Sequence, residues 1–331
     1  MRTFLATFVL GVGICGTANA ATYTTFDPQG STDTFPYAIN DHDEIVGTFL
    51  DLQGVAHGFA RNMTGKITTF DPSGSAGTRV YDLNNDGTIV GGFYDSADVQ
   101  HGFIRTTDGT ITSFDVKRSY GSFAASINAN GVIAGMYQDE ANLSHGFVRA
   151  SDGTITKFDI PGERYTFVGS DSINKKGIVA GGYQDKNTLY NHGFLRTPDG
   201  KITVIDYPGA YSTAVDCISD DGTLAGTYQV DAFHLHGFVE APDGTVTSFD
   251  PNLSYSTVPS GINSNDEIVG TFGKKHGSFR SFYRRPTGSI GQFTVDRLGR
   301  DTESFGINGR QKMTGTYTDS TGTFHGFLRI P

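Results

Sequence analysis

A motif of about 44 residues recurs seven times along this chain and restricts it to repeat architectures. In the second copy the motif reads Leu83-Asn84, then Gly91, then His101-Gly-Phe-x-Arg. The central glycines are Gly47, Gly91, Gly135, Gly181, Gly226, Gly270 and Gly315. Each copy holds four short runs rich in β-forming residues, separated by turns such as Asn-Asp-Gly that supply the positive φ of a tight hairpin. Four antiparallel strands in about 44 residues is the size of one propeller blade.

The two ends of the chain complete each other. Residues 23–27 match the fourth strand of a copy, whereas the chain stops after residues 327–329, which match the third strand. The first residues therefore supply the strand that the last copy lacks, and pairing them would leave no open sheet edge. We expect an all-β fold, a single seven-bladed β-propeller of four-stranded blades, closed by the N-terminal strand joining the C-terminal blade.

The first 20 residues have the three parts of a secretory signal peptide: Arg2, an apolar run from Phe4 to Ile14, and Ala18-Asn19-Ala20. We therefore divide the chain into a signal peptide, residues 1–20, and a propeller, residues 21–331. A secreted or periplasmic monomer without membrane insertion is expected. The net charge of −10 argues against a nucleic-acid partner. Cys217, the one cysteine outside the signal peptide, leaves no internal disulfide and replaces a small inner-strand residue of the other copies.

Six histidines, one per copy except the sixth, lie about 44 residues apart. In a propeller they form a wide ring that cannot converge on one ion, so we expect neither a metal site nor a cofactor. A structural hydrogen bond is the favoured role. The predicted partners are the aspartates four residues after the central glycine: Asp51, Asp95, Asp139, Asp185 and Asp319. The sixth copy has lost both members, with Lys274 and Arg280 in their places.

Other repeated residues also predict structural roles. The phenylalanines of the third strand and those of the fourth should fill the space between blades. In the fourth strand these are Phe26, Phe70, Phe114, Phe158 and Phe249, with Ile205 and Val295 in the remaining copies. The arginines that end the third strand, such as Arg61, are interpreted as a solvated outer band with weak cross-strand pairs.

The His-Gly-Phe-x-Arg and Ile-Asn-x-x-Gly-x-Ile-Val-Gly patterns resemble those of the bacterial extracellular HAF repeat family. The resemblance covers nearly all of the chain after the signal peptide, and the sixth copy departs from it at Lys274 and Arg280. It implies an exported repeat protein, generally without an assigned activity, and it carries over no catalytic residue.

The connections between copies differ, and they predict where a ligand binds. Tyrosines stand in four consecutive connections, at Tyr120, Tyr165, Tyr211 and Tyr255. Lys117, Arg118 and Arg164 flank them. Aromatic faces with a polar tip suit sugars, peptides or aromatic polymers. The alternative is that each tyrosine only packs on its neighbouring blade.

A second candidate site is Asp171 with Asp216, each two residues before the repeated isoleucine of adjacent copies. Two carboxylates near the channel mouth could bind a cation or act as an acid/base pair, joined by His234. The alternative is that they line a wet channel.

We predict an exported binding or scaffold protein that recognises a carbohydrate, a peptide or a cell-envelope polymer on its variable-loop face. An extracellular lyase or hydrolase acting on a polymer at the same face is the alternative.

Overall fold

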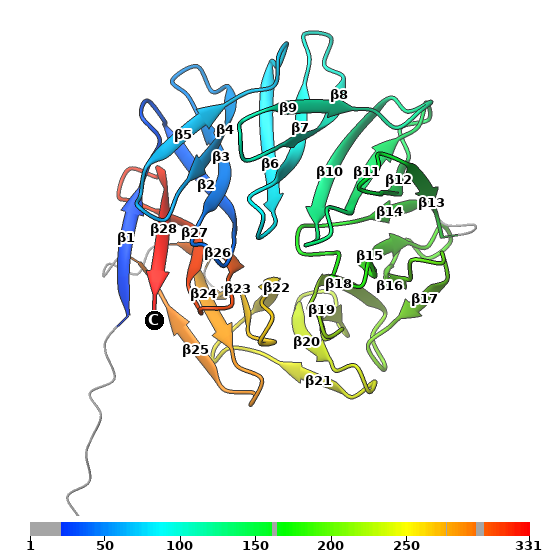
Figure 1. Ribbon diagram of the computed structural model, residues 1–331. Helices are drawn as coiled ribbons and strands as arrows, with labels where there is room; N and C mark the ends of the chain where they lie inside the picture. Colours follow the sequence, from blue (N-terminus) through cyan, green and yellow to red (C-terminus); the bar gives the residue numbers. More distant parts are fainter. Residues whose placement is uncertain (1–20, 161–163, 276, 296–300) are drawn as a thin grey trace, which may run out of the picture.

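The computed structural model describes residues 21–160, 164–275, 277–295 and 301–331. The expected signal peptide, residues 1–20, lies outside the described residues. All 28 elements are strands, arranged as seven four-stranded antiparallel sheets around a central channel (Figure 1). Within the described part of the chain, no helix could cross a membrane. The predicted seven-bladed propeller is therefore confirmed.

Each blade runs outward from the channel in sequence order. Blades 1 and 2 comprise β2 (Asp33–Ile39), β3 (Ile45–Leu50), β4 (Ala56–Arg61) and β5 (Ile67–Phe70), then β6 (Gly77–Leu83), β7 (Ile89–Tyr94), β8 (Gln100–Arg105) and β9 (Ile111–Phe114). Blades 3 and 4 comprise β10 (Gly121–Ile127), β11 (Ile133–Gln138), β12 (Ser144–Arg149) and β13 (Ile155–Phe158), then β14 (Tyr165–Phe167), β15 (Val179–Gln184), β16 (Asn191–Arg196) and β17 (Ile202–Ile205). Blades 5 and 6 comprise β18 (Ser212–Ile218), β19 (Leu224–Gln229), β20 (His236–Glu240) and β21 (Val246–Phe249), then β22 (Ser256–Ile262), β23 (Ile268–Gly273), β24 (Phe279–Arg284) and β25 (Ile290–Phe293). Blade 7 comprises β26 (Thr302–Ile307), β27 (Met313–Thr318) and β28 (Phe324–Ile330), with β1 (Thr22–Phe26) as its outer strand.

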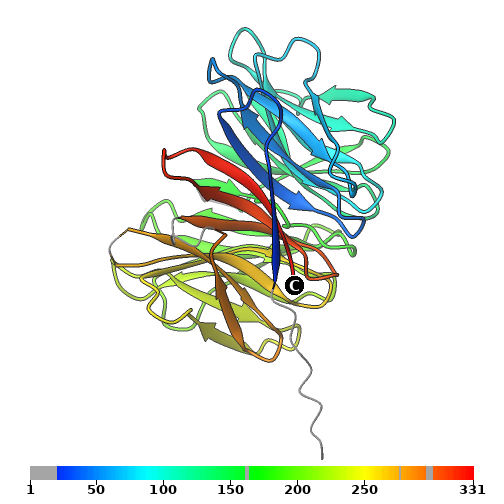
Figure 2. The ribbon, with the colours of Figure 1, turned by 90° about the vertical axis from the view of Figure 1, so that its left-hand side faces the viewer.

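The ring closes where the two ends of the described chain meet. β1 pairs antiparallel with β28, from Thr22 opposite Ile330 to Phe26 opposite Gly326. Figure 2 shows the two strands side by side. The expected closure is confirmed, and it satisfies the backbone of an edge that would otherwise invite pairing with another chain.

The central glycine of each copy lies on the second strand, where the backbone of the inner strand approaches it closely. A Cβ at Gly91 would lie 2.1 Å from the carbonyl oxygen of Arg79 and 2.7 Å from the ring of Phe103. The equivalent glycines show the same contact with the backbone of the inner strand. Only glycine allows this approach, which explains why the register of the repeat depends on it.

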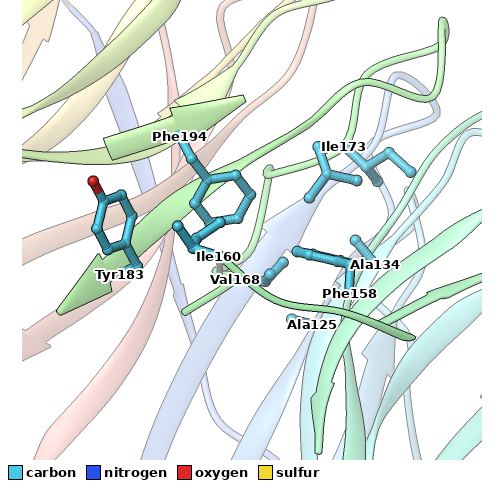
Figure 3. Close-up of a cluster of buried hydrophobic side chains, with 9 residues drawn as sticks. Ala125, Ala134, Phe158, Ile160, Val168, Ile173, Tyr183 and Phe194 are labelled. Carbon is cyan, nitrogen blue, oxygen red and sulfur yellow. The ribbon is translucent and has the colours of Figure 1, made fainter. Parts of the chain in front are cut away.

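Third-strand and fourth-strand phenylalanines fill the space between blades, as expected. Phe158 of blade 3 meets the edge of Phe194 of blade 4 at 5.9 Å between ring centroids. Around them lie Ala125, Ala134, Ile160, Val168, Ile173, Val179 and Tyr183 (Figure 3). The assignment of Val295 to the fourth-strand position was wrong, because Phe293 pairs with Ser281 in the register of Phe70 with Gly58. Phe293 lies 23 residues after the central Gly270, the same spacing as from Gly47 to Phe70.

The third-strand arginines do not form a solvated band. Arg61 is 7% exposed, and its guanidinium lies 5.0 Å from the ring centroid of Phe26, the fourth-strand residue of the preceding blade. The same contact recurs for Arg105, Arg149, Arg196, Arg284 and Arg329 with Phe70, Phe114, Phe158, Phe249 and Phe293. Glu240 replaces the arginine of blade 5, and the preceding blade carries Ile205 instead of a phenylalanine. Arginine and aromatic ring are thus lost together, as a cation–π pair between blades would require.

We expect a double-mutant cycle between Arg105 and Phe70 to give a coupling of about 1 kcal/mol, the range of a partly desolvated cation–π pair. The variants are Arg105→Met, which keeps most of the stem, Phe70→Leu, and both together. Unfolding in urea measures each free energy. The matched junction is Glu240 with Ile205, where Glu240→Gln and Ile205→Val should show no coupling. Equal coupling at the two junctions would contradict the assignment.

Each repeated histidine bonds at least one carboxylate, and four of the six lie between two. Its Nδ1 bonds the aspartate that ends the fourth strand of the same blade at 2.6–2.8 Å; these are Asp71, Asp115, Asp159, Asp206, Asp250 and Asp27. The predicted partners Asp51, Asp95, Asp139 and Asp319 are confirmed at the other nitrogen, at 3.2–3.5 Å. The carboxylate of Asp185 instead accepts the N–H groups of Asn187 and Thr188. Sequence reasoning missed the closer partner.

The fourth-strand aspartate also reaches the next blade. Thr78 donates its hydroxyl to Asp71 at 2.5 Å, and Thr34 donates to Asp27 at 2.6 Å across the closed junction. Histidine, aspartate and threonine therefore link neighbouring blades. Blade 6 has Lys274, Arg280 and, after Phe293, Thr294 in place of the histidine and its two aspartates, whereas Thr302 keeps the threonine position of the junction.

We expect His57, His101 and His325 to stabilise the fold most in mild acid. Burial lowers the pKa of each histidine, but the two neighbouring carboxylates outweigh burial and raise the pKa above its ordinary value of 6.5. A raised folded-state pKa gives stability that is fully present below the unfolded pKa and is lost as pH rises through the folded one. The free energy of unfolding lost in the triple glutamine variant should be greatest near pH 5.5 and smallest near pH 8.5, as urea unfolding at about those values can measure. A loss independent of pH would contradict this prediction.

A ring of asparagine amides encircles the channel at the end of the inner strands. Each Nδ2 donates to the main-chain oxygen at the same position in the next blade, at 2.9–3.2 Å; the donors are Asn40, Asn84, Asn128, Asn174, Asn263 and Asn308. The bond from Asn308 to Asn40 crosses the closed junction. In blade 5, Ser219 stands at the asparagine position, and its main-chain oxygen accepts the hydrogen bond from the Asn174 amide. These hydrogen bonds between neighbouring blades explain why the asparagine of the Ile-Asn pair is repeated.

Candidate functional site

The two faces of the ring carry different connections. The loops between second and third strands and the links from each blade to the next open on one face, which we call the variable face. The opposite face carries the short turns of the asparagine ring and the turns between third and fourth strands. Variation between copies is therefore concentrated on one face, where a ligand site is most readily built.

Three of the four predicted tyrosines hold equivalent positions on the variable face. The main-chain N–H groups of Tyr120, Tyr211 and Tyr255 donate to the last residue of the second strand in the next blade. In blade 4 it is Arg164 that makes this bond, and Tyr165 lies one position later, opposite Gln184. The two-residue insertion before β14 thus shifts Tyr165 out of the common register, and its ring lies under the Arg164 guanidinium at 4.9 Å.

Two of the tyrosines contact side chains from the loop between the second and third strands. Tyr190 lies 4.8 Å from Tyr211 and His234 lies 4.7 Å from Tyr255, between ring centroids. The hydroxyl of Tyr211 donates to the main-chain oxygen of Asp231 at 2.5 Å, which joins the loops of blades 4 and 5. We call Tyr190, Tyr211, Phe233, His234 and Tyr255 the aromatic arc.

The aromatic arc keeps apolar surface open to solvent. Tyr190 is 46% exposed and Phe233 is 72% exposed. Sequence reasoning missed Tyr190 and Phe233 because their two loops depart from the common pattern: the loop of blade 4 is one residue longer, and that of blade 5 has Val230 in place of the turn aspartate. Their signal was present only as aromatic residues in loops that are otherwise polar. The structure brings Tyr211 and Tyr255 into this arc, whereas Tyr120 and Tyr165 stand at the two preceding junctions.

Asp171 and Asp216 lie on the wall of the channel, away from the tyrosines. Asp216 is the extra residue of a β-bulge between Val215 and Cys217. Asp171 occupies the corresponding place in blade 4, with φ of 52°, after an inner strand that is regular only over Tyr165–Phe167. His234 does not join them, because its Nδ1 bonds Asp231 at 2.9 Å on the variable face.

Burial raises the pKa of both carboxylates, and a neighbouring charge adds to the effect at Asp171 only. Burial raises the pKa of Asp216 to about 7, and its Oδ2 is buried with no hydrogen-bond partner among the described residues. Burial raises the pKa of Asp171 well above its ordinary value, and the charge of Asp82 adds to this. The carboxylate that acts on Asp171 is therefore Asp82 of blade 2, and no Asp171–Asp216 acid/base pair is observed.

Asp82 and Asp171 line the inner end of an axial cavity of about 180 Å³ that opens through the asparagine ring. Ser126 and the main-chain N–H of Ile127 donate to Asp82 at 3.0 and 2.8 Å, and burial raises its pKa to about 6. Across residues 21–331, excluding the gaps noted above, no group of three His, Cys, Asp or Glu side chains could hold a metal ion. The cavity is thus a polar channel end with four carboxyl groups, because Asp41 and Asp220 also line it.

Cys217 is fully buried between blades, and burial raises the pKa of its thiol well above the ordinary value. A thiol in this environment stays protonated and unreactive at neutral pH. Its packing role agrees with the sequence interpretation.

Comparison with known proteins identifies the architecture. No family model matches the chain, and no curated protein matches it either. Among solved structures, a streptogramin B lyase is similar with a TM-score of 0.63 at 16% identity, over 94% of this chain and 98% of that one. The likeness is one of fold alone.

Two further propellers show the range of proteins with this fold. The β-propeller domain of the trilobed protease from Pyrococcus furiosus has a TM-score of 0.67 at 9% identity, over 90% of this chain and 95% of that one. That domain has an open velcro topology, whereas here β1 pairs with β28. The BP39L lectin from Burkholderia pseudomallei has a TM-score of 0.57 at 10% identity, over 90% and 96% of the two chains.

Proposed function

We propose that this protein is an exported binding module that holds a carbohydrate chain on its variable face, against the aromatic arc. The observation that carries the proposal is the continuity of the arc, in which loops and connections of blades 4, 5 and 6 contact one another and leave Tyr190 and Phe233 open. Aromatic rings of this kind present a flat apolar face with polar edges, which matches the alternating apolar and hydroxyl surface of a sugar. A lectin is among the proteins that share the fold.

The alternative of a lyase or hydrolase at the same face has less support. The carboxylates suggested for acid/base chemistry, Asp171 and Asp216, lie along the channel, and the pKa of Asp171 responds to Asp82. General acid/base catalysis requires two groups within reach of one substrate atom. The titratable groups that the described residues place beside the aromatic arc are His234 and Asp231, which are engaged with each other at 2.9 Å.

The test is a panel of soluble polysaccharides and peptides, with binding and turnover measured on the same samples. We expect saturable binding of a polysaccharide without product formation, weakened about tenfold or more by Tyr190→Ala with Phe233→Ala, since each ring contact is worth about 0.5–1.5 kcal/mol. Tyr211→Phe should keep the affinity because it keeps the ring. Leu52→Ala, on the exposed second loop of blade 1, is the matched control. Binding that is equal in all variants, or binding of peptides alone, would overturn the proposal.

A further inference from the structure

The junction between blades 2 and 3 carries a groove on the side of the ring. Its volume is about 580 Å³, and it runs between β9 and β13. Phe114, Val116 and Ile155 supply apolar walls, and the charged residues that line it are three cations and one carboxylate: Lys117, Arg149, Lys157 and Asp115. The groove therefore combines apolar surface with positive charge in a protein whose net charge is −10.

Two cations of this groove, Lys117 and Lys157, differ from the residues at the matching positions of other copies. Lys117-Arg118 follows Val116, where other connections read Pro28-Gln29-Gly30, Pro72-Ser73-Gly74, Tyr207-Pro208-Gly209 and Pro251-Asn252-Leu253. Lys157 pairs with Phe147, and the residues in the same register of the other blades are Thr25, Thr69, Ser113, Val204, Ser248 and Gln292. Lys117 and Lys157 have no counterpart in these four connections or at the six matching fourth-strand positions, so neither lysine is required for packing; Arg149, by contrast, is the repeated third-strand arginine.

Lys157 is held in place across the junction. Its Nζ donates to the main-chain oxygen of Lys117 at 2.6 Å and lies 4.3 Å from the ring centroid of Tyr137. An ammonium has three N–H donors, so two remain for a ligand. The bond positions the charge at the end of the groove nearest the variable face.

No carboxylate of the described residues forms an ion pair with Lys117, Arg118 or Lys157. The two nearest fourth-strand aspartates are engaged elsewhere, because Asp115 bonds His101 at 2.8 Å and Asp159 bonds His145 at 2.6 Å. The positive charge of the groove is thus left for an external anion. Tyr120, 59% exposed and three residues beyond Lys117, is an exposed aromatic residue of the same connection.

We propose that this groove binds an acidic sugar unit, one that carries a carboxylate or a sulfate, and that the carbohydrate held by the aromatic arc is therefore an anionic polysaccharide. This inference rests on the proposed function. An anionic chain is repelled by most of the protein surface, so local cations decide where it docks. The lysines contact the acid group, and Tyr120 stacks on the sugar ring.

The probes are polygalacturonate and its fully methyl-esterified form, which share one backbone and differ in charge, with dextran sulfate and dextran as the sulfate pair. We expect the acidic form of at least one pair to bind about tenfold or more tightly than its neutral form, and this preference to weaken as salt rises, because the Debye length is only about 8 Å at 0.15 M. The preference should disappear in Lys117→Ala with Lys157→Gln. Lys201→Ala, an exposed lysine on the opposite face, should change nothing.

The outcomes separate the two proposals. Equal binding of acidic and neutral polymers would overturn the acidic-sugar assignment and leave the carbohydrate module standing. Binding of neither form of any glycan would overturn both. A charge preference that survives in the double lysine variant, with an unchanged unfolding midpoint, would place the anion site elsewhere. Equally tight binding of polyglutamate or single-stranded DNA would identify a general polyanion groove and contradict recognition of a sugar.

Discussion

Removal of residues 21–27 is expected to cost about 5 kcal/mol or more, enough to open or unfold a domain of ordinary stability. The deletion removes the outer strand of blade 7 and with it Phe26, which packs against Phe59 and lies beneath Arg61. It also removes Asp27, which bonds both His325 and Thr34. A truncated large aromatic residue costs about 3 kcal/mol, and the cation–π pair and each lost hydrogen bond add about 1 kcal/mol.

The measurement is urea unfolding of the shortened chain, alone and with a synthetic peptide of residues 21–28. The peptide should restore most of the lost stability by pairing with β28, and the same peptide carrying Phe26→Ala should restore less. If the shortened chain is as stable as the full one, closure by β1 makes no energetic contribution.

Asp216→Asn is expected to stabilise the protein at neutral pH. The pKa of Asp216 lies near 7 in the fold against 3.8 in the unfolded chain. Between these values the folded state binds more protons than the unfolded state, so the free energy of unfolding falls as pH rises from about 4 to about 7. At about 1.4 kcal/mol per pKa unit the ionised carboxylate costs at most about 4 kcal/mol, and access to water in the channel reduces this to about 2–4 kcal/mol.

The increase in the free energy of unfolding caused by Asp216→Asn should be greatest near pH 8. It should be close to zero near pH 4, where the protonated carboxyl and the amide have the same charge. Urea unfolding at about four pH values, 4, 5, 7 and 8, measures it. Glu140→Gln, which removes an exposed carboxylate, is the matched control and should show no such trend. Destabilisation by Asp216→Asn at pH 8 would mean that the ionised carboxylate has a stabilising partner.

Ring closure and blade number followed from the sequence because both depend only on register. The constant spacing between Asn84, Gly91 and His101 identifies four strands per copy, and residues 23–27 fit the missing strand. Val295 was assigned to the fourth strand in error, because Phe293 keeps the spacing of 23 residues from the central glycine that Phe70 and Phe114 have. The spacing within a copy identifies its strands, whereas the connections between copies change length.

Contacts between blades were harder to predict. Arg61 was expected in solvent, yet it stacks on Phe26 of the preceding blade, a contact between segments that no local pattern links. The histidine partner Asp71 was missed for a similar reason, because it lies 14 residues away on the adjacent strand. The sequence did hold a sign of the arginine–phenylalanine contact, because Glu240 replaces the arginine at the same junction where Ile205 replaces the phenylalanine. The resemblance to the HAF repeat family and the signal peptide stay predictions.

The aromatic arc required coordinates for the same reason. Tyr211 and Tyr255 could be chosen from the connections between blades. Tyr190 and Phe233 belong to second loops that depart from the pattern of the other copies. Asp171 and Asp216 were chosen for their equivalent positions, but an irregular inner strand in blade 4 turns Asp171 toward Asp82. Equivalent sequence positions predict equivalent surroundings only where the blade is regular.

Hydrogen exchange of the wild-type protein, with and without a saturating polysaccharide from the binding panel, tests the central claim most directly. We predict protection of amides in residues 185–191 and 230–235, the second loops of blades 4 and 5, and in the connections that hold Tyr211 and Tyr255. The turns of the asparagine ring on the opposite face should exchange as before. Protection confined to those turns, or to the axial cavity near Asp82 and Asp171, would contradict the assignment of the ligand site to the variable face.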